Sequence, residues 1–76
     1  MTGKISLNQV FARNLRDLRR ARELSQIELA RMSSLSARYV GILERCEKSP
    51  TIDTVQALAE ALAVEPSQLI APEVPI

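Results

Sequence analysis

The chain has 76 residues, which is the length of one small domain. Hydrophobic residues make up 46% of it and charged residues 25%, a balance that excludes a disordered segment, and no apolar run is long enough to span a membrane. With no histidine, one cysteine and two glycines, it has no zinc ligand set and no glycine-rich phosphate loop, so we expect no metal, no cofactor and no enzyme activity. The lone Cys46 is typical of a reducing compartment, and we expect a cytoplasmic protein.

The net charge of +1 is divided unequally along the chain. All ten Lys and Arg lie in residues 1–48, which carry a net charge of +5, whereas residues 49–76 hold no base and carry −4. A basic half beside an acidic half favours a face that binds a polyanion, although an ordinary solvated helical surface would explain the pattern equally well.

Apolar residues recur at helical spacing and strand signals are missing, which predicts an all-α fold. The first helix is expected to begin at Ser6, whose hydroxyl can cap it, and to end near Arg22 or Glu23. Residues 1–5 before it are expected to form a flexible arm. The apolar stripe that should face the core consists of Leu7, Phe11, Leu15 and Leu18.

Two short helices are expected next, over residues 25–33 and 36–45, with a tight turn between them. The first opens with Ser25 and Glu28, the pattern of a capping box, and Ser36 is positioned to cap the second. Two short helices at this separation are typical of a helix-turn-helix unit.

The fourth helix is expected to begin after Thr51, and it has the clearest amphipathic pattern in the chain. A fifth, short helix should start with Pro66 and run through Ile70. We therefore expect one domain over residues 6–71 and a non-helical tail over residues 72–76. The stripe of the fourth helix consists of Ile52, Val55, Leu58, Ala59 and Leu62.

Three motifs in register resemble the phage repressor and Cro type (XRE) helix-turn-helix family. Residues 24–30, LSQIELA, resemble its LSQxELA signature, and residues 36–45, SARYVGILER, resemble its recognition helix with the IERG ending. Residues 49–64 are similar to its fourth helix, NPSxxTLxxLAxAL. The resemblance covers about residues 7–71, and it implies a compact five-helix bundle of the lambda-repressor-like type that binds double-stranded DNA.

The resemblance also implies which side chains reach DNA. The expected base contacts are Gln26, Ala37, Arg38 and Ile42. The expected phosphate contacts are Ser25, Ser36, Tyr39, Arg45 and Lys48. Arg38 is the expected specific contact, because a guanidinium can bind guanine O6 and N7 together. Gly41 is expected on the same outer face, whereas Ile42 could instead be partly core and Tyr39 could pack against the first helix.

Two further expectations concern structure. By resemblance, Arg19 and Glu44 form an ion pair that links the first helix to the end of the third. Relatives often have glycine at the positions of Glu23, Ser34 and Cys46. Because a left-handed backbone costs a non-glycine residue roughly 1 kcal/mol, either the stability is lower or these turns adopt another geometry. We interpret Cys46 as a small loop residue and not as a redox sensor.

Because residues 49–76 hold no base, we do not expect them to contact DNA phosphates. We expect them to form a homodimer through the fifth helix and the end of the fourth. The expected interface residues are Val64, Leu69 and Ile70, with residues 74–76 as a possible addition. These residues could instead only cap the core. A two-fold dimer would match half-sites about 34 Å apart.

The sequence thus predicts a bacterial or phage-encoded homodimeric transcriptional regulator on a pseudo-palindromic operator, with no membrane contact and no small-molecule effector. Restriction–modification controller proteins and prophage repressors fit this description equally. The alternative is a protein-interaction module on the same scaffold, such as an antitoxin-like or adaptor domain. Ala37 and Ile42 on the reading face favour the alternative, whereas Arg38 and the basic half oppose it.

Overall fold

The computed structural model describes residues 6–72, and over this range it contains five α-helices and no strands. They are α1 (Leu7–Ala21), α2 (Gln26–Ser33), α3 (Ala37–Glu44), α4 (Ile52–Leu62) and α5 (Pro66–Ile70). The expected arm over residues 1–5 and residues 73–76 of the expected tail lie outside the described residues. No helix in the described part of the chain has the length and apolar character needed to cross a lipid bilayer.

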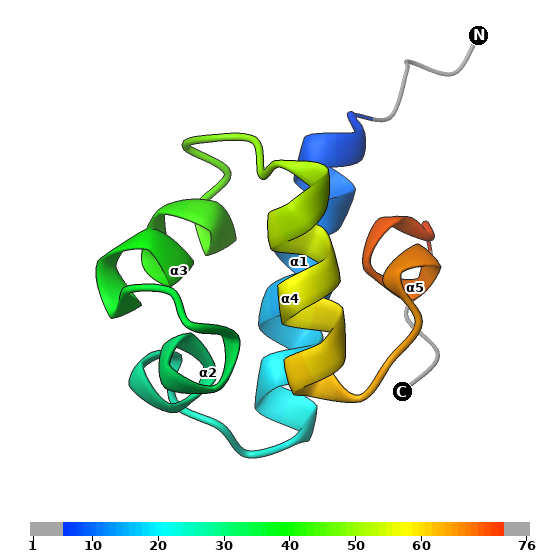
Figure 1. Cartoon of the computed structure of the whole chain (residues 1–76). Coiled ribbons are helices and arrows are strands. Elements are labelled where there is room, and N and C mark those ends of the chain that lie inside the picture. Colours follow the sequence, from blue (N-terminus) through cyan, green and yellow to red (C-terminus); the bar gives the residue numbers. More distant parts are fainter. Residues whose placement is uncertain (1–5, 73–76) are drawn as a thin grey trace, which may run out of the picture.

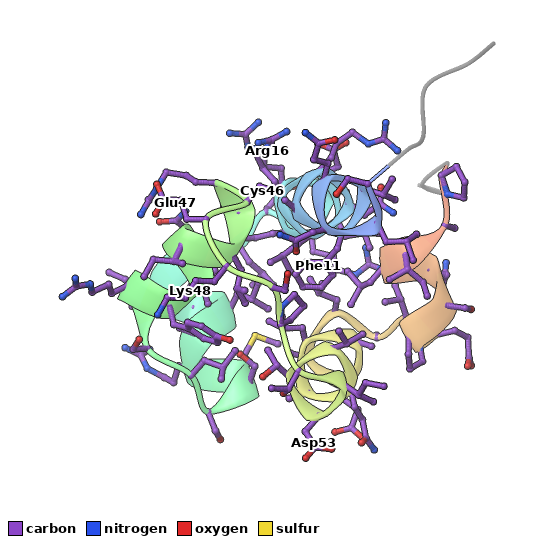
Figure 2. All side chains as sticks on the ribbon, turned by 90° about the horizontal axis from the view of Figure 1, so that it is seen from above. Phe11, Arg16, Cys46, Glu47, Lys48 and Asp53 are labelled. Carbon is purple, nitrogen blue, oxygen red and sulfur yellow. The ribbon has the colours of Figure 1, made fainter. Side chains whose placement is uncertain are left out.

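The helices α1 and α4 occupy the centre of the molecule, with α2 and α3 on one side and α5 on the other (Figure 1). In the perpendicular view, the side chain of Phe11 points from α1 toward the interior between these helices (Figure 2). The fully buried side chains come from all five helices and form one core: Phe11, Leu15, Leu18, Leu29, Val40, Leu43, Leu58, Leu62 and Leu69.

Each helix begins where its capping residue predicts. In the first four helices, the cap side chain accepts a hydrogen bond from the backbone amide three residues later; these caps are Ser6, Ser25, Ser36 and Thr51. In α2 the capping box is complete, because Glu28 Oε1 also accepts from the Ser25 amide at 2.7 Å. These bonds satisfy amides that the first turn of a helix leaves without partners, which explains why local sequence located the helix starts.

The apolar stripes predicted to face the core each include one exposed residue, at the start of α1 and at the start of α4. Leu7 is 61% exposed and Ile52 is 85% exposed, so the expectation that both face the core was wrong. Each is the first residue of its helix, and no described element covers that end of the bundle. Helical periodicity identifies the face of a helix, but it does not show how far along the helix the neighbouring elements reach.

A buried amide fixes α5 against α1. Asn14 is fully buried, and its Nδ2 donates to the carbonyl oxygens of Gln68 at 3.2 Å, Leu69 at 3.2 Å and Ala71 at 2.6 Å. Arg13 donates from the same helix to the carbonyl of Pro72. The last carbonyl groups of a helix have no partner within it, so these donors end α5 and hold the chain after it on α1.

The connections between the helices adopt the left-handed backbone that glycine favours, although none of them contains glycine. The backbone angle φ is 56° at Glu23, 60° at Ser34 and 61° at Cys46, the three positions where relatives often have glycine. A fourth left-handed residue, Ala63 with φ of 59°, ends α4. Of the two expected explanations, the turns therefore keep the glycine geometry, and the chain carries its conformational cost.

Candidate nucleic-acid interface

The turn between α2 and α3 fixes the angle at which α3 is presented. Ser34 takes the left-handed conformation, and the Leu35 amide donates to the carbonyl of Ala30 at 2.8 Å. Within α2, the buried Ser33 hydroxyl donates to the carbonyl of Leu29 at 2.7 Å. Since α2 packs on both α3 and α4, and Leu35 packs against the core, α3 is held firmly on the side of the molecule seen at the left of Figure 1.

The exposed side of α3 and the loop after it carry three basic side chains. Arg38, Arg45 and Lys48 are all exposed. Arg45 is paired with Glu47, with Nε 3.0 Å from Oε2 and Nη2 3.3 Å from Oε1, whereas no carboxylate among the described residues pairs with Arg38. This hydrogen bonding raises the pKa of Arg45 and lowers the pKa of Glu47. Figure 2 shows Glu47 and Arg16 along one side of the molecule, and Asp53 on the opposite side.

The predicted outer face of α3 is less open than the sequence suggests. Gly41 is buried although it lies on the outer face of α3. The reason is that the Arg45 guanidinium and the Gln26 amide lie over it, and a Cβ at Gly41 would be 3.1 Å from Arg45 Nη1. Ala37 and Tyr39 are half-buried and pack against the core, while Ile42 is half-buried.

The two predicted N-terminal phosphate contacts are the caps of α2 and α3. Ser25 Oγ accepts from the Glu28 amide and Ser36 Oγ accepts from the Tyr39 amide, each at 3.0 Å. Both serines are exposed, and each hydroxyl keeps its hydrogen as a donor while it caps the helix. A helix start of this kind attracts anions through its amide groups and its dipole.

Arg19, Gln26 and Glu44 form a network that joins α1, α2 and α3. Arg19 Nε lies 2.6 Å from Glu44 Oε2, and Arg19 Nη2 lies 3.0 Å from Glu44 Oε1. Gln26 Nε2 donates to the same Oε1 at 3.0 Å, and Arg19 Nη1 donates to the carbonyl of Leu24 at 2.8 Å. The resemblance implied the ion pair, but sequence reasoning missed Gln26 as its third member.

Burial and hydrogen bonding act on Glu44 in opposite directions. Only 4% of its side chain is exposed, and this burial raises its pKa. The hydrogen bonds from Arg19 and Gln26, together with the positive charges of Arg19 and Arg20, outweigh the effect of burial, so the pKa of Glu44 lies below its ordinary value of 4.5. Glu44 is therefore a buried carboxylate that stays ionised at neutral pH.

The predicted dimer residues do not share one exposed surface. Leu69 is fully buried in the protomer core, so its expected role in an interface was wrong. Its side chain is already packed among the other helices and cannot reach a second chain. Val64 is half-buried and packs against the core, whereas Ile70 is 43% exposed.

A different apolar surface surrounds Ile70. Two shallow grooves meet there between the starts of α1 and α4 and the helix α5. We call this surface the apolar patch, and it comprises Leu7, Pro50, Ile52, Val55, Pro66 and Ile70. Sequence reasoning placed Leu7 and Ile52 in the core and so missed it; their position at the first residue of each helix is the signal that could have shown it.

Sequence comparison identifies relatives over most of the chain. The helix-turn-helix family HTH_3 matches residues 15–69. The control protein C.SmaI of Serratia marcescens is 35% identical over 66 residues, which are 87% of this chain and 79% of that protein. The immunity repressor of Bacillus phage phi105 is 32% identical over 59 residues, which are 78% of this chain and 41% of that protein.

Solved structures match the arrangement of the helices. The restriction–modification controller protein C.AhdI of Aeromonas hydrophila superposes with a TM-score of 0.79 at 40% identity, covering 82% of this chain and 94% of that one. The P22 c2 repressor, solved with a synthetic operator, gives a TM-score of 0.78 at 26% identity, covering 86% and 98%. The predicted lambda-repressor-like fold is thus confirmed, and the chain belongs to the XRE/Cro-type helix-turn-helix family of DNA-binding transcriptional regulators, which are not enzymes.

Proposed function

We propose that the chain is a repressor or controller-type regulator that binds a pseudo-palindromic operator as a homodimer, with one α3 in the major groove at each half-site. The observation that carries the proposal is Arg38, an exposed arginine on α3 that pairs with no carboxylate among the described residues. The major groove admits an α-helix, and an unpaired guanidinium can bind guanine O6 and N7 there.

The proposed contacts divide into base reading and positioning. Arg38 reads bases, with Gln26 at the edge of the reading surface and Ala37 and Ile42 limited to apolar contact with a thymine methyl group. Phosphates are bound by the helix starts at Ser25 and Ser36, and by Tyr39, Arg45 and Lys48. For Arg45 the ion pair with Glu47 must open, which costs little because both side chains are more than half exposed.

We propose that the apolar patch, and not the end of α4, forms the dimer interface. Ile52 and Ile70 are exposed at 85% and 43%, and groove-lining Val55 and Pro66 lie beside them. Apolar surface of this kind, concentrated in one place on a small protein, is typical of a protein–protein contact. Since the patch holds no basic residue, pairing two copies through it would leave the basic surface on α3 available for DNA.

Selection of bound sites from random duplexes tests the proposal. We expect a two-fold symmetric site, and we expect Arg38→Ala to lose the preference at one base pair in each half-site. The control variant is Arg31→Ala, which also removes one exposed arginine but lies in the last turn of α2, away from the start of that helix and from the apolar patch. Wild-type protein that recovers no common site, or that binds mixed DNA with no dependence on salt, would contradict the proposal.

The alternative, a protein-interaction module, is less well supported than the sequence suggested. It relied on Ala37 and Ile42 as apolar residues on an open face. Ala37 packs against the core and Ile42 is half-buried, so neither provides a prominent apolar contact.

A further inference from the structure

The Gln26 side chain has one orientation that suits its surroundings. An amide group has a donor end, Nε2, and an acceptor end, Oε1, whereas an ionised carboxylate only accepts. Gln26 Nε2 donates to Glu44 Oε1 at 3.0 Å. The reversed amide would place Oε1 against a carboxylate that is 4% exposed, and two acceptor oxygens would then face each other away from water. The amide of Gln26 therefore points its Nε2 toward Glu44 and its Oε1 away from Glu44.

The carboxylate is itself prevented from turning. Arg19 binds both Glu44 oxygens, at 2.6 Å and 3.0 Å, and Arg19 is in turn held by the carbonyl of Leu24 at 2.8 Å. Paired hydrogen bonds between a guanidinium and a carboxylate fix the plane of both groups. The orientation of Gln26 is thus set from α1, through a buried residue at the end of α3.

Gly41 leaves space for this arrangement on α3. A Cβ at Gly41 would lie 3.7 Å from Gln26 Oε1 and 3.8 Å from Gln26 Nε2, so the amide rests directly over the helix. Gln26 is the first residue of α2, and its amide therefore lies beside the surface of α3 that carries Arg38.

We propose that Glu44 is a positioning residue for base recognition: it fixes the amide of Gln26 so that this side chain selects a base edge offering an amino group. Such an edge belongs to adenine, through N6, or to cytosine, through N4, whereas guanine and thymine offer acceptors at the equivalent positions in the major groove. The second hydrogen of Nε2 remains available, so adenine can still be bound at N6 and N7. The inference rests on the proposed function, because it concerns how the same surface reads DNA.

The test compares base preferences, which a purely structural role of Glu44 would not change. Wild type, Glu44→Gln, Gln26→Ala and the double variant are titrated against the selected operator with each base pair of one half-site replaced in turn. In wild type we expect an A·T or C·G preference of roughly tenfold at one pair near the outer edge of the half-site. Glu44→Gln should reduce it to below about threefold, because a neutral amide at residue 44 can accept or donate and lets Gln26 reverse. In the double variant, the preference at this base pair should equal that of Gln26→Ala alone.

Two controls separate this inference from the proposed function. Arg38→Ala should lose preference at a different pair, so discrimination by Arg38 together with an unchanged preference in Glu44→Gln would overturn the inference and leave the function standing. A uniform loss of affinity in Glu44→Gln, with every preference intact, would also overturn it. Absence of any sequence preference in wild type would instead overturn the function.

Should Glu44→Gln fail to fold, the wild-type protein still decides the question. In nuclear magnetic resonance spectra, one of the two Nε2 protons of Gln26 should exchange more slowly at pH 7 and resonate downfield of the same proton of the exposed Gln9, and both features should weaken in Glu44→Asp, whose shorter side chain retracts the carboxylate. Nε2 protons of Gln26 that match those of Gln9 in both shift and exchange rate would overturn the inference.

Discussion

Replacing Ala63 with glycine should stabilise the protein, although it removes a methyl group. Ala63 ends α4 with φ of 59° and ψ of 42°, and its amide donates to the carbonyl groups of Ala59 and Glu60. Those hydrogen bonds involve only the backbone, so glycine can keep them. The side chain is exposed, so its loss removes little packing.

The expected gain follows from two opposing terms. A non-glycine residue in the left-handed conformation costs roughly 1–2 kcal/mol. Replacement by glycine removes this cost and so raises the free energy of unfolding by the same amount. It also lowers the free energy of unfolding by roughly 0.5–1 kcal/mol, because glycine gives the unfolded chain more conformations. The net increase in the free energy of unfolding is therefore about 0–1.5 kcal/mol, and its midpoint of about 0.75 kcal/mol corresponds to a rise of roughly 3–6 °C in Tm for a domain of this size.

Thermal and urea unfolding followed by circular dichroism measure the effect, with Ala57→Gly as the control. Ala57 lies inside α4, where the same change should lower the free energy of unfolding by about 1 kcal/mol or more. Equal losses of Tm in the two variants would refute the reasoning, because the sign must follow the backbone conformation.

The other left-handed residues should respond according to their surroundings. Glu23→Gly and Ser34→Gly should each resemble Ala63→Gly, since both side chains are exposed. Cys46→Gly should gain less, because Cys46 is half-buried and its Sγ accepts a hydrogen bond from Asn8 Nδ2 at 3.3 Å. That ordering distinguishes backbone strain from a general effect of added glycine.

Three further outcomes are expected. Asn14→Ala should lower the free energy of unfolding by roughly 1–3 kcal/mol in urea titrations, because three carbonyl groups, one of them in a fully buried hydrogen bond, lose their shared donor. The lowered pKa of Glu44 means that its contribution to stability is present above about pH 4.5, the unfolded value, and is lost as the pH falls toward the folded value. Glu44→Gln should flatten this fall in urea titrations from pH 6 to pH 3. Ile52→Ser should shift sedimentation toward the monomer, whereas Ile27→Ser, a matched change at a 60% exposed isoleucine on α2, should leave the dimer intact.

Local sequence predicted the helices well because their starts depend on neighbouring residues. A serine or threonine that accepts from an amide three residues later is visible in any single sequence, and all four such caps begin helices as expected. The three turn positions were also recognised, since their unusual residue types stand where relatives often have glycine. Ala63 was missed because alanine favours the interior of a helix, so its residue type does not mark the left-handed end of α4.

What the sequence could not predict depends on contacts between distant residues. Asn14 occurs within the apolar pattern of α1, and its partners are carbonyl groups more than 50 residues further along the chain. Leu69 and Ile70 are both apolar neighbours on α5, yet one is fully buried and the other 43% exposed. Only the packing of α5 on α1 and α4 decides between them, so the sequence could not show that Leu69 belongs to the core while Ile70 stays at the surface.

The charges on the reading surface give a reason why this regulator would need two copies. Among the described residues, Arg19 is held inside by Glu44 and Arg45 is shared with Glu47, which leaves Arg38 as the exposed arginine of α3 without a carboxylate partner. One protomer therefore offers DNA a single base-reading arginine from α3. If the apolar patch joins two protomers, both half-sites are bound together, and the second contact forms at a high effective concentration. Occupancy of the operator would then rise steeply with protein concentration, so the regulator could respond to its own abundance.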